Sequence, residues 1–390
     1  MSVIRNAVCG LVLATFGCSA QGNVEMADDS TRKIADGPTR KIVAPAKGVY
    51  LGAYDWRENE RNPGVKEFEE AIGAKVAITS GGVCVSSEGR PFSVDASCLR
   101  RLGEKGYVVL IDVVPRGYSP QQIIEGEADR LLTEVAEAIK SASVPVMLAY
   151  PREPELQPRI GFDGGGYGPR GDQLRGEVDD PYGAYGCTAP DDPMCLDGPE
   201  RYRHMCRHMH DVIEMQAPGI ATWVAGAAVT LWPSNAASSQ HYELFYPGDA
   251  YADWHAINVY PAWSGDSDDL QTDKMWGEIV EPIWAEITRI SPDKPVIITE
   301  FGLHSQAGGR DAWFIDFFAE ARTNPNYSNL KAFIYWQMGE DAFDGSNCRI
   351  RRTDSAAETW KAEVSANRSF WFSDVETSTG TNVTGLGGGL

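Results

Sequence analysis

Two glutamates stand at the ends of short apolar stretches, where paired carboxyl groups could do chemistry. Glu153 follows Leu148-Ala149-Tyr150-Pro151-Arg152, and Glu300 follows Val296-Ile297-Ile298-Thr299. Cleavage of a glycosidic bond with retention uses two carboxyl groups about 5–5.5 Å apart, one to protonate the leaving oxygen and one to attack the anomeric carbon. Repulsion between two such groups keeps one of them protonated. The sequence therefore predicts Glu153 and Glu300 as a catalytic pair.

Both glutamates also have a structural interpretation, because an acidic residue at a strand end often forms a salt bridge. Arg152 and Arg159 lie close to Glu153 in the sequence, and Glu155 competes with it for the role of acid. Glu300 is less easily explained in this way, because burial of a carboxylate after four apolar or threonine residues needs a compensating reason.

The elements that would position these residues alternate regularly along the chain. Short, apolar, β-branched runs, eight in number, occupy Gly48–Tyr54, Lys75–Ser80, Tyr107–Val114, Val144–Tyr150, Ala221–Val229, Trp254–Tyr260, Pro295–Thr299 and Leu330–Trp336. Helical patterns lie between most of them, at Gly64–Ile72, Val94–Lys105, Pro120–Ser141, Arg201–Met215, Asp269–Ile290 and Gly309–Arg322. Continuous apolar strands indicate a sheet buried on both faces.

This alternation predicts an α/β fold: a (β/α)₈ barrel, as a single domain with a long loop after strand 4. In such a barrel the carboxyl ends of strands 4 and 7 face one cavity, where Glu153 and Glu300 would meet. An open doubly wound sheet is the competing architecture, but it usually shows a glycine-rich nucleotide loop after its first strand, and Gly48-Val-Tyr-Leu-Gly52 is not one. The connection between Arg152 and Pro199 is long enough to indicate a functional or disordered loop.

Other catalytic patterns are weak, and no cofactor is expected. His204 and His208 have the spacing of zinc proteases, but Met205 stands where their glutamate would be, so we expect these residues and His210 to pack on a helix and predict no metal. No Gly-x-Ser-x-Gly nucleophile motif stands out. The net charge of −20 disfavours nucleic acid and anionic lipid as partners and favours a neutral substrate.

The amino terminus predicts export. Residues 1–20 read as a signal peptide, cut after Ala20 or, alternatively, processed as a lipoprotein with a lipid on Cys18. Residues 21–46 are predicted to form a flexible linker, residues 47–372 the barrel domain, and residues 373–390 a disordered tail. The expected protein is secreted or held at the cell surface, monomeric, and attached to a membrane only through that lipid.

An exported chain with an even number of cysteines is expected to form disulfides. The simplest pairings are Cys187 with Cys195 and Cys84 with Cys98, and the sequence does not fix the connectivity. The remaining mature cysteines are Cys206 and Cys348.

Several segments resemble glycoside hydrolase family 26, which consists mostly of endo-β-mannanases. Ile298-Thr-Glu-Phe-Gly302 is similar to the strand that carries the nucleophile in that family, and Met147-Leu-Ala-Tyr-Pro-Arg-Glu153 stands where the family carries its acid/base. Residues 246–260 resemble the approach to strand 6, and residues 207–224 resemble helix 4 and strand 5. The resemblance covers most of residues 48–340.

The resemblance implies roles for particular residues. Glu300 would be the nucleophile, Glu153 the acid/base, Tyr260 a hydrogen-bond donor to the nucleophile, and Trp336 the platform under the sugar at the cleaved bond. Further subsites would use Trp56, Trp263 and Asp55. Arg152, which the family does not have at its position, is expected from its charge to orient Glu153. The implied substrate is a β-1,4-linked polysaccharide, with β-mannan ahead of β-glucan and xylan.

This sequence departs from the family around the acid/base. Arg152 stands where the family has histidine, Pro154-Glu155 replace Met-Asn, and Ala225 replaces an aromatic residue at the end of strand 5. These departures leave two alternatives to a family 26 mannanase: a glucanase or xylanase of the same superfamily, or a catalytically inactive barrel that binds glycan at the cell surface.

Overall fold

The computed structural model describes residues 40–55, 64–86, 92–152, 198–226, 228–231, 242–262, 275–339, 347–378 and 382–383. The main strands are β1 (Val49–Tyr54), β2 (Ile78–Ser80), β5 (Val108–Asp112), β6 (Val146–Ala149), β7 (Ala221–Val224), β8 (Ala228–Leu231), β9 (His255–Ala262), β10 (Val296–Leu303) and β11 (Leu330–Trp336). The helices are α1 (Gly64–Ile72), α2 (Ala96–Glu104), α3 (Pro120–Ile124), α4 (Asp129–Ala142), α6 (Gly198–Gln216), α7 (Tyr242–Phe245), α8 (Trp276–Ile290), α9 (Arg310–Thr323) and α10 (Ser355–Ala366).

These strands form one parallel sheet in the order β7-β6-β5-β2-β1-β11-β10-β9-β8. β7 and β8 share one position in the barrel: β7 pairs with β6, and β8 pairs with β9. Backbone hydrogen bonds also join the end of β7 to Trp254, just before β9, with Trp254 N donating to the Trp223 carbonyl at 3.0 Å. The sheet therefore closes, and the predicted (β/α)₈ barrel is confirmed.

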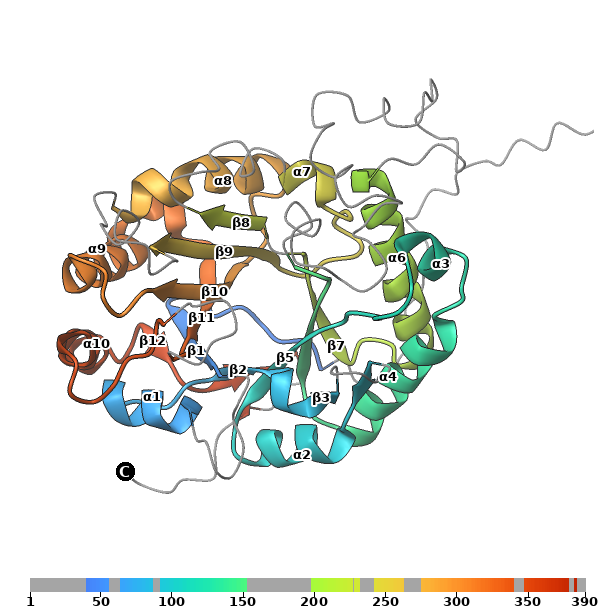
Figure 1. The fold of residues 1–390 in the computed structure, drawn as a ribbon, viewed down its shortest axis with the longest axis horizontal. Helices are drawn as coiled ribbons and strands as arrows, with labels where there is room; N and C mark the ends of the chain where they lie inside the picture. The colour runs from blue at the N-terminus through green and yellow to red at the C-terminus, as the bar shows by residue number, and fades with distance from the viewer. Residues whose placement is uncertain are drawn as a thin grey trace, which may run out of the picture. The chain divides into compact units, whose positions relative to one another are not determined.

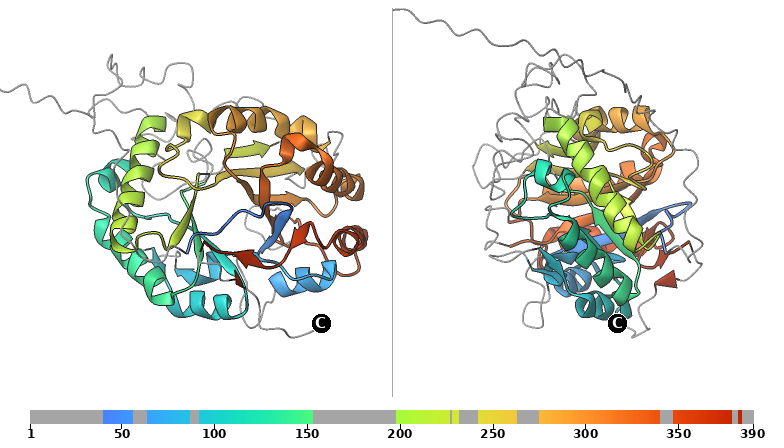
Figure 2. Two further views of the ribbon diagram at one scale, coloured as in Figure 1. Left: turned by 180° about the vertical axis from the view of Figure 1, so that it is seen from behind. Right: turned by 90° about the vertical axis from the view of Figure 1, so that its right-hand side faces the viewer.

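The helices surround this sheet as a ring, seen end-on in Figure 1 and from behind and from the side in Figure 2. A large buried cluster lies between the helices and the outward-facing side chains of the strands, with Phe68, Phe301 and Trp360 among its members. A second cluster fills the barrel interior, with Ile78, Met147 and other inward-facing residues. Because both faces are buried, each strand is apolar along its length, which is why the sequence showed runs without alternation.

The terminal segments of the described chain close the amino-terminal end of the barrel. Ile42 is buried in the interior cluster and donates its backbone N–H to Thr222 Oγ1 at 2.7 Å. Ile42 also forms an antiparallel bridge with Thr377, and β13 (Val375–Glu376) pairs with β14 (Asn382–Val383). Parts of the segments expected to form the linker and the tail, residues 42 and 375–377, thus pack against the barrel in this structure.

Most of the predicted elements are present, with two differences. The helix predicted for Pro120–Ser141 is divided into α3 and α4, because Gly126 between them has a φ of 85° that a helix does not allow. Helix α10 was not predicted, and it packs against α1 and α9 through Trp360. Short elements complete the fold: β3 (Val85–Ser86), β4 (Ser93–Val94), β12 (Trp371–Phe372) and the 3₁₀ turns Gly81–Cys84 and Pro325–Tyr327.

One of the two expected disulfides lies within the described residues. Cys84 and Cys98 form a disulfide that ties the 3₁₀ turn after β2 to helix α2. Cys206 and Cys348 are buried, and neither belongs to a disulfide among the described residues. Cys187 and Cys195 lie outside the described residues. Within the described chain, no helix combines the length and apolar character needed to cross a bilayer.

Candidate active site at the carboxyl ends of the strands

Glu300 is presented to the barrel mouth by an irregularity in β10. The pairing with β9 shifts between Ile298, opposite Ile257, and Glu300, opposite Asn258. Neighbouring strand residues normally point to opposite faces, and a bulge re-aims them. Here Thr299 Oγ1 donates to Asn258 Oδ1 at 2.7 Å, and Asn258 Nδ2 donates to Glu300 Oε2 at 3.4 Å. One asparagine therefore holds two consecutive residues of the strand.

The carboxylate of Glu300 is buried, with the residue 8% exposed, and both of its oxygens are bound. The Tyr260 hydroxyl donates to Oε2 at 2.6 Å, and Arg152 Nη1 forms an ion pair with Oε1. A buried carboxylate is tolerated only when charge and hydrogen bonds compensate for its lost hydration. The three donors supply this compensation and fix the orientation of the group.

Arg152 is positioned by the segment that follows β6. The Tyr202 hydroxyl, on α6, donates to the Pro151 carbonyl at 2.6 Å. Gly226 gives Tyr202 its space, because a Cβ at that position would lie 1.8 Å from the Tyr202 hydroxyl oxygen. The Tyr150 hydroxyl donates to the Tyr251 carbonyl at 2.6 Å, which anchors the strand end from the other side.

Arg152 also binds a carboxylate that the sequence analysis did not identify. Its Nη2 donates to Asp112 Oδ2 at 2.6 Å. Asp112 is the last residue of β5, so it lies at the same rim as Glu300. Burial raises the pKa of the Asp112 carboxyl, and the Arg152 charge opposes that rise. The signal was available, since Asp112 ends a strand just as the two predicted glutamates do.

Aromatic rings form one wall of the site. Trp336, the last residue of β11, stacks on Tyr54 with the ring centroids 4.5 Å apart, and meets the edge of Tyr260 at 6.3 Å. Trp336 is 4% exposed. Burial raises the pKa of the Tyr54 hydroxyl strongly, so this group is a neutral phenol. Tyr54 is a second residue of the site that the sequence analysis missed.

The other residues predicted for the site are Asp55 and four residues that the structure does not describe. The Asp55 side chain is fully buried and pairs with Arg349 Nη2 at 3.3 Å, against the start of α1, where a Cβ on Gly64 would overlap it. In the structure Asp55 therefore anchors a loop and does not present a surface to a sugar. Glu153, Glu155, Trp56 and Trp263 lie outside the described residues. The structure brings Glu300, Tyr260, Arg152 and Trp336 together, and Arg152, which was expected to orient Glu153, pairs with Glu300 and Asp112.

The histidines of α6 contact neighbouring elements individually. His208 Nε2 lies 2.6 Å from Asp129 Oδ1 at the start of α4, and the His210 ring lies 5.1 Å from that of Trp223. Burial lowers the pKa of His204. Within the described residues, no group of three or more His, Cys, Asp or Glu side chains is arranged to hold a metal ion.

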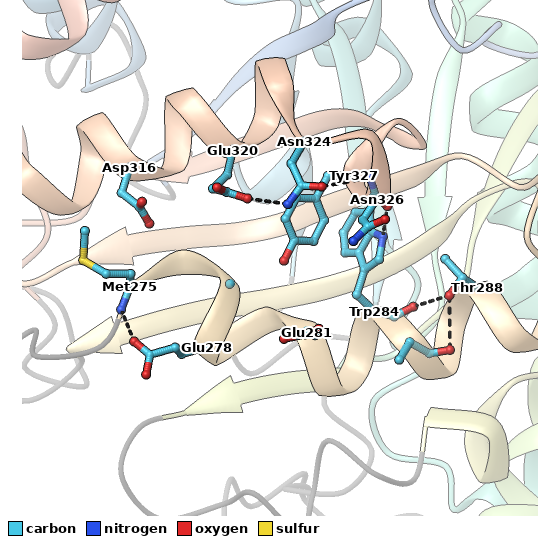
Figure 3. Close-up of a pocket in the computed structure, with 12 residues that line it drawn as sticks. Met275, Glu278, Glu281, Trp284, Thr288, Asp316, Glu320, Asn324, Asn326 and Tyr327 are labelled. Atoms are coloured by element: carbon cyan, nitrogen blue, oxygen red, sulfur yellow. Dashed lines mark hydrogen bonds between the residues drawn. The ribbon is translucent and has the colours of Figure 1, made fainter.

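A groove on the outer surface of the barrel, between α8 and α9, is rich in acidic residues (Figure 3). Its carboxylates serve the local structure. Glu278 and Asp316 accept hydrogen bonds from backbone amides at the start of α8, and Glu320 accepts one from Asn324 at 2.6 Å. These carboxylates therefore stabilise helix ends. We place the chemistry at the barrel mouth, where Glu300 lies.

The fold and the site define a class: a (β/α)₈ barrel with a buried, hydrogen-bonded glutamate on its seventh strand and an aromatic wall. Solved structures share this fold. A modular endo-β-1,4-mannanase from Cellulomonas fimi superposes with a TM-score of 0.55 at 16% identity, over 86% of this chain and 77% of that one. The catalytic domain of a family 26 endo-β-1,4-mannanase from Bacillus sp. JAMB-750 gives 0.54 at 12% identity, over 84% and 92%.

Sequence comparison finds a curated relative. Endoglucanase H of Acetivibrio thermocellus is 22% identical over 331 residues, which are 83% of this chain and 31% of that protein. This chain thus matches less than a third of the length of the curated relative. No family model matches the chain. The chain has the fold of the family 26 glycoside hydrolases, and at that level the resemblance stated from the sequence is confirmed.

Proposed function

We propose that this chain is a retaining glycoside hydrolase that cleaves a β-1,4-linked polysaccharide. Glu300 is the nucleophile, and Glu153 is the acid/base. The observation that carries the proposal is the placement of Glu300: a buried carboxylate at the carboxyl end of β10, with one oxygen held by Tyr260 and Asn258 and the other by Arg152. An oriented, ionised carboxylate at the mouth of a barrel is what a glycosidase nucleophile requires.

The reaction proceeds by two displacements at the anomeric carbon. In the first, a Glu300 oxygen forms a bond to C1 while Glu153 gives its proton to the leaving glycosidic oxygen. In the second, Glu153 takes a proton from water, the water oxygen bonds to C1, and the C1–Glu300 bond breaks with its electron pair returning to the carboxylate. Tyr260 keeps the Glu300 group in one orientation through both steps, so that little rearrangement precedes the attack.

The leading substrate is β-mannan, with mixed-linkage β-glucan and xylan next. The structures with the same fold are endo-β-1,4-mannanases, and the curated relative is an endoglucanase. Arg152 and Ala225 replace residues expected at the cleaved bond, so the substrate is best determined by a panel of these three polysaccharides.

Release of reducing sugar from that panel tests the proposal. We expect the wild type to degrade at least one polysaccharide and Glu300→Gln to lose activity by at least about a thousandfold, because removal of a catalytic nucleophile leaves only residual rate enhancement. Glu281→Gln, on the exposed side of α8, is the matched control and should retain full activity. Glu153→Gln and Glu155→Gln identify the acid: only the true acid variant should lose turnover of polysaccharide while still cleaving an aryl glycoside with a good leaving group.

A second candidate is an inactive barrel that binds glycan. The observation that favours it is the ion pair between Arg152 and Glu300, which occupies a carboxylate oxygen of the nucleophile. In that case the wild type would bind a polysaccharide of the panel without releasing sugar, and Glu300→Gln would leave the affinity unchanged.

We also propose that the chain is exported. The Cys84–Cys98 disulfide supports this proposal, because disulfides persist mainly in oxidising compartments. Mass spectrometry of the mature amino terminus distinguishes cleavage after Ala20 from a lipid-modified Cys18, and an intact Met1 would contradict export.

A further inference from the structure

Three charged side chains from separate strand ends form a line across the barrel mouth. Asp112 ends β5, Arg152 follows β6, and Glu300 belongs to β10. Asp112 Oδ2 lies 2.6 Å from Arg152 Nη2, and Arg152 Nη1 pairs with Glu300 Oε1. β5 and β6 are neighbours, with Asp112 opposite Ala149, whereas β10 lies further round the barrel. Arg152 therefore reaches from its own side of the barrel to the candidate nucleophile.

The rigidity of the guanidinium makes the two contacts of Arg152 interdependent. Its nitrogens lie in one plane at fixed angles, so a bond at Nη2 determines where Nη1 can point. Without Asp112, the long and flexible side chain of Arg152 would have several rotamers available, of which only some reach Glu300. The hydrogen bond from Arg152 Nη2 to Asp112 favours the rotamers of Arg152 that reach Glu300.

The state of Asp112 fits a role in positioning. Its side chain is 21% exposed, and its Oδ1 is buried without a hydrogen-bond partner among the described residues. Burial raises the pKa of this carboxyl. An incompletely compensated carboxylate destabilises a fold, and such groups cluster at functional sites.

We propose that Asp112 is a positioning residue that aims Arg152 at Glu300, so that the Arg152 charge stabilises the carboxylate that leaves in the second displacement. This inference rests on the proposed function. When water bonds to C1 and the C1–Glu300 bond breaks, the electron pair returns to Glu300 beside the guanidinium, and the proton of the water goes to Glu153. The same charge makes Glu300 a weaker nucleophile in the first displacement. Asp112 thereby sets the balance between the two steps in favour of hydrolysis of the glycosyl-enzyme.

Kinetics with an activated aryl β-glycoside separate this role from a structural one. In Asp112→Asn we expect kcat to fall about tenfold or more and KM to fall with it, since the second step becomes limiting and the glycosyl-enzyme accumulates. A burst of about one equivalent of aglycone should precede the steady state. Asp112→Glu should recover part of kcat, and Arg152→Lys, which cannot bridge two carboxylates, should show the same burst.

Glu243→Gln is the matched control, because it removes a carboxylate that pairs with an arginine, Arg289, at 2.5 Å on the surface between α7 and α8. It should leave kcat and KM unchanged. A fall in kcat without a fall in KM and without a burst would contradict the proposal, as would wild-type kinetics in Asp112→Asn.

A crystal structure of Asp112→Asn gives a test that does not depend on turnover. We expect the Arg152 guanidinium to leave Glu300, so that no nitrogen of Arg152 remains within about 4 Å of either carboxylate oxygen. Arg152 remaining in its wild-type place would overturn the proposal whatever the kinetics show. If the wild type cleaves no glycan, the proposed function fails, and this structure alone decides whether Asp112 positions Arg152. Should Asp112→Asn not fold, Asp112→Glu and Arg152→Lys are compared in the same way.

Discussion

At the scale of single residues, Glu300 shares its carboxylate among three donors: Tyr260 and Asn258 lie on β9, and Arg152 follows β6. Tyr260 contributes the short, neutral hydrogen bond, at 2.6 Å, and Arg152 contributes the charge. Each donor stabilises the ionised group, and Tyr260 also contacts Trp336, so it links the nucleophile to the aromatic wall. Loss of Tyr260's hydroxyl should therefore affect catalysis without removing the charge balance of the site.

Replacement of Tyr260 by phenylalanine tests this role. A hydrogen bond to a charged group contributes about 1.5–3 kcal/mol, so we expect kcat/KM to fall roughly ten- to hundredfold in Tyr260→Phe. Steady-state kinetics on the best polysaccharide measure this change. Tyr107→Phe is a close control, because Tyr107 also donates from a buried hydroxyl to a glutamate, Glu69 at 3.1 Å, outside the site. Equal losses in the two variants would mean that the effect is one of stability.

The sequence predicted where residues lie when their placement follows from one strand. Glu300 and Tyr260 each end an apolar run, and the barrel brings such ends to one rim. Asp112 also ends an apolar run, but its role depends on the pairing with Arg152, which comes from a distant part of the sequence. Asp55 shows the opposite error: its position after β1 is at the rim, but Arg349, distant in sequence, holds its side chain inward.

At the scale of elements, the eight apolar runs predicted the barrel because each strand is buried on both faces. The helices were predicted less accurately. Gly126 divides one predicted helix into α3 and α4, and α10 shows too weak a periodicity to be recognised alone. Its burial comes from tertiary contacts of Trp360 with Phe68 and Phe318, which the sequence does not reveal.

The disulfide between Cys84 and Cys98 stabilises the connection between β2 and α2. The two residues are 14 apart in sequence, and a crosslink that closes a loop of this size contributes about 3 kcal/mol by restricting the unfolded chain. We expect the double variant Cys84→Ala/Cys98→Ala to lose about that amount of unfolding free energy and to keep its kcat, because the disulfide lies outside the site. Urea denaturation measures the change.

Reductant provides the control for this prediction. It should lower the unfolding free energy of the wild type by about 3 kcal/mol more than that of the double variant, because only the wild type carries the Cys84–Cys98 crosslink. Insensitivity of the wild type to reductant would argue that the disulfide contributes nothing to stability.

At the scale of the whole domain, residues from both ends of the described chain close the amino-terminal end of the barrel. Ile42 and Val375 lie near opposite ends of the domain's sequence, yet both are buried in the interior cluster. Ile42 was expected in a flexible linker and Val375 in a disordered tail, because short polar segments with isolated apolar residues show no periodic pattern. Both residues pack into the amino-terminal end of the barrel, and that end exists only once the strands have assembled.

The stability of this fold should depend on pH through a histidine buried at the start of β9. His255 is 0% exposed, and burial together with the charge of Lys294 lowers its pKa from 6.5 to about 4. Because the unfolded chain binds a proton below pH 6.5 and the folded chain only below about 4, the free energy of unfolding falls as the pH drops between these values. At 1.36 kcal/mol per pKa unit, the loss attributable to His255 is at most about 3 kcal/mol.

Comparison with His255→Gln isolates this contribution. Glutamine retains an acceptor for the Tyr242 hydroxyl, which lies 2.9 Å from His255 Nδ1, and does not titrate. Glu69 and Glu286, whose pKa values are raised by burial, act in the opposite direction, but they are common to both proteins and cancel in the difference. Urea unfolding at several pH values between 7 and 4 should therefore show the variant losing less stability with acid than the wild type. Parallel curves for the two proteins would show that His255 binds its proton equally in the folded and unfolded chains, and acid sensitivity would then have to arise from carboxylates whose pKa is lowered on folding, such as Asp95 and Glu243.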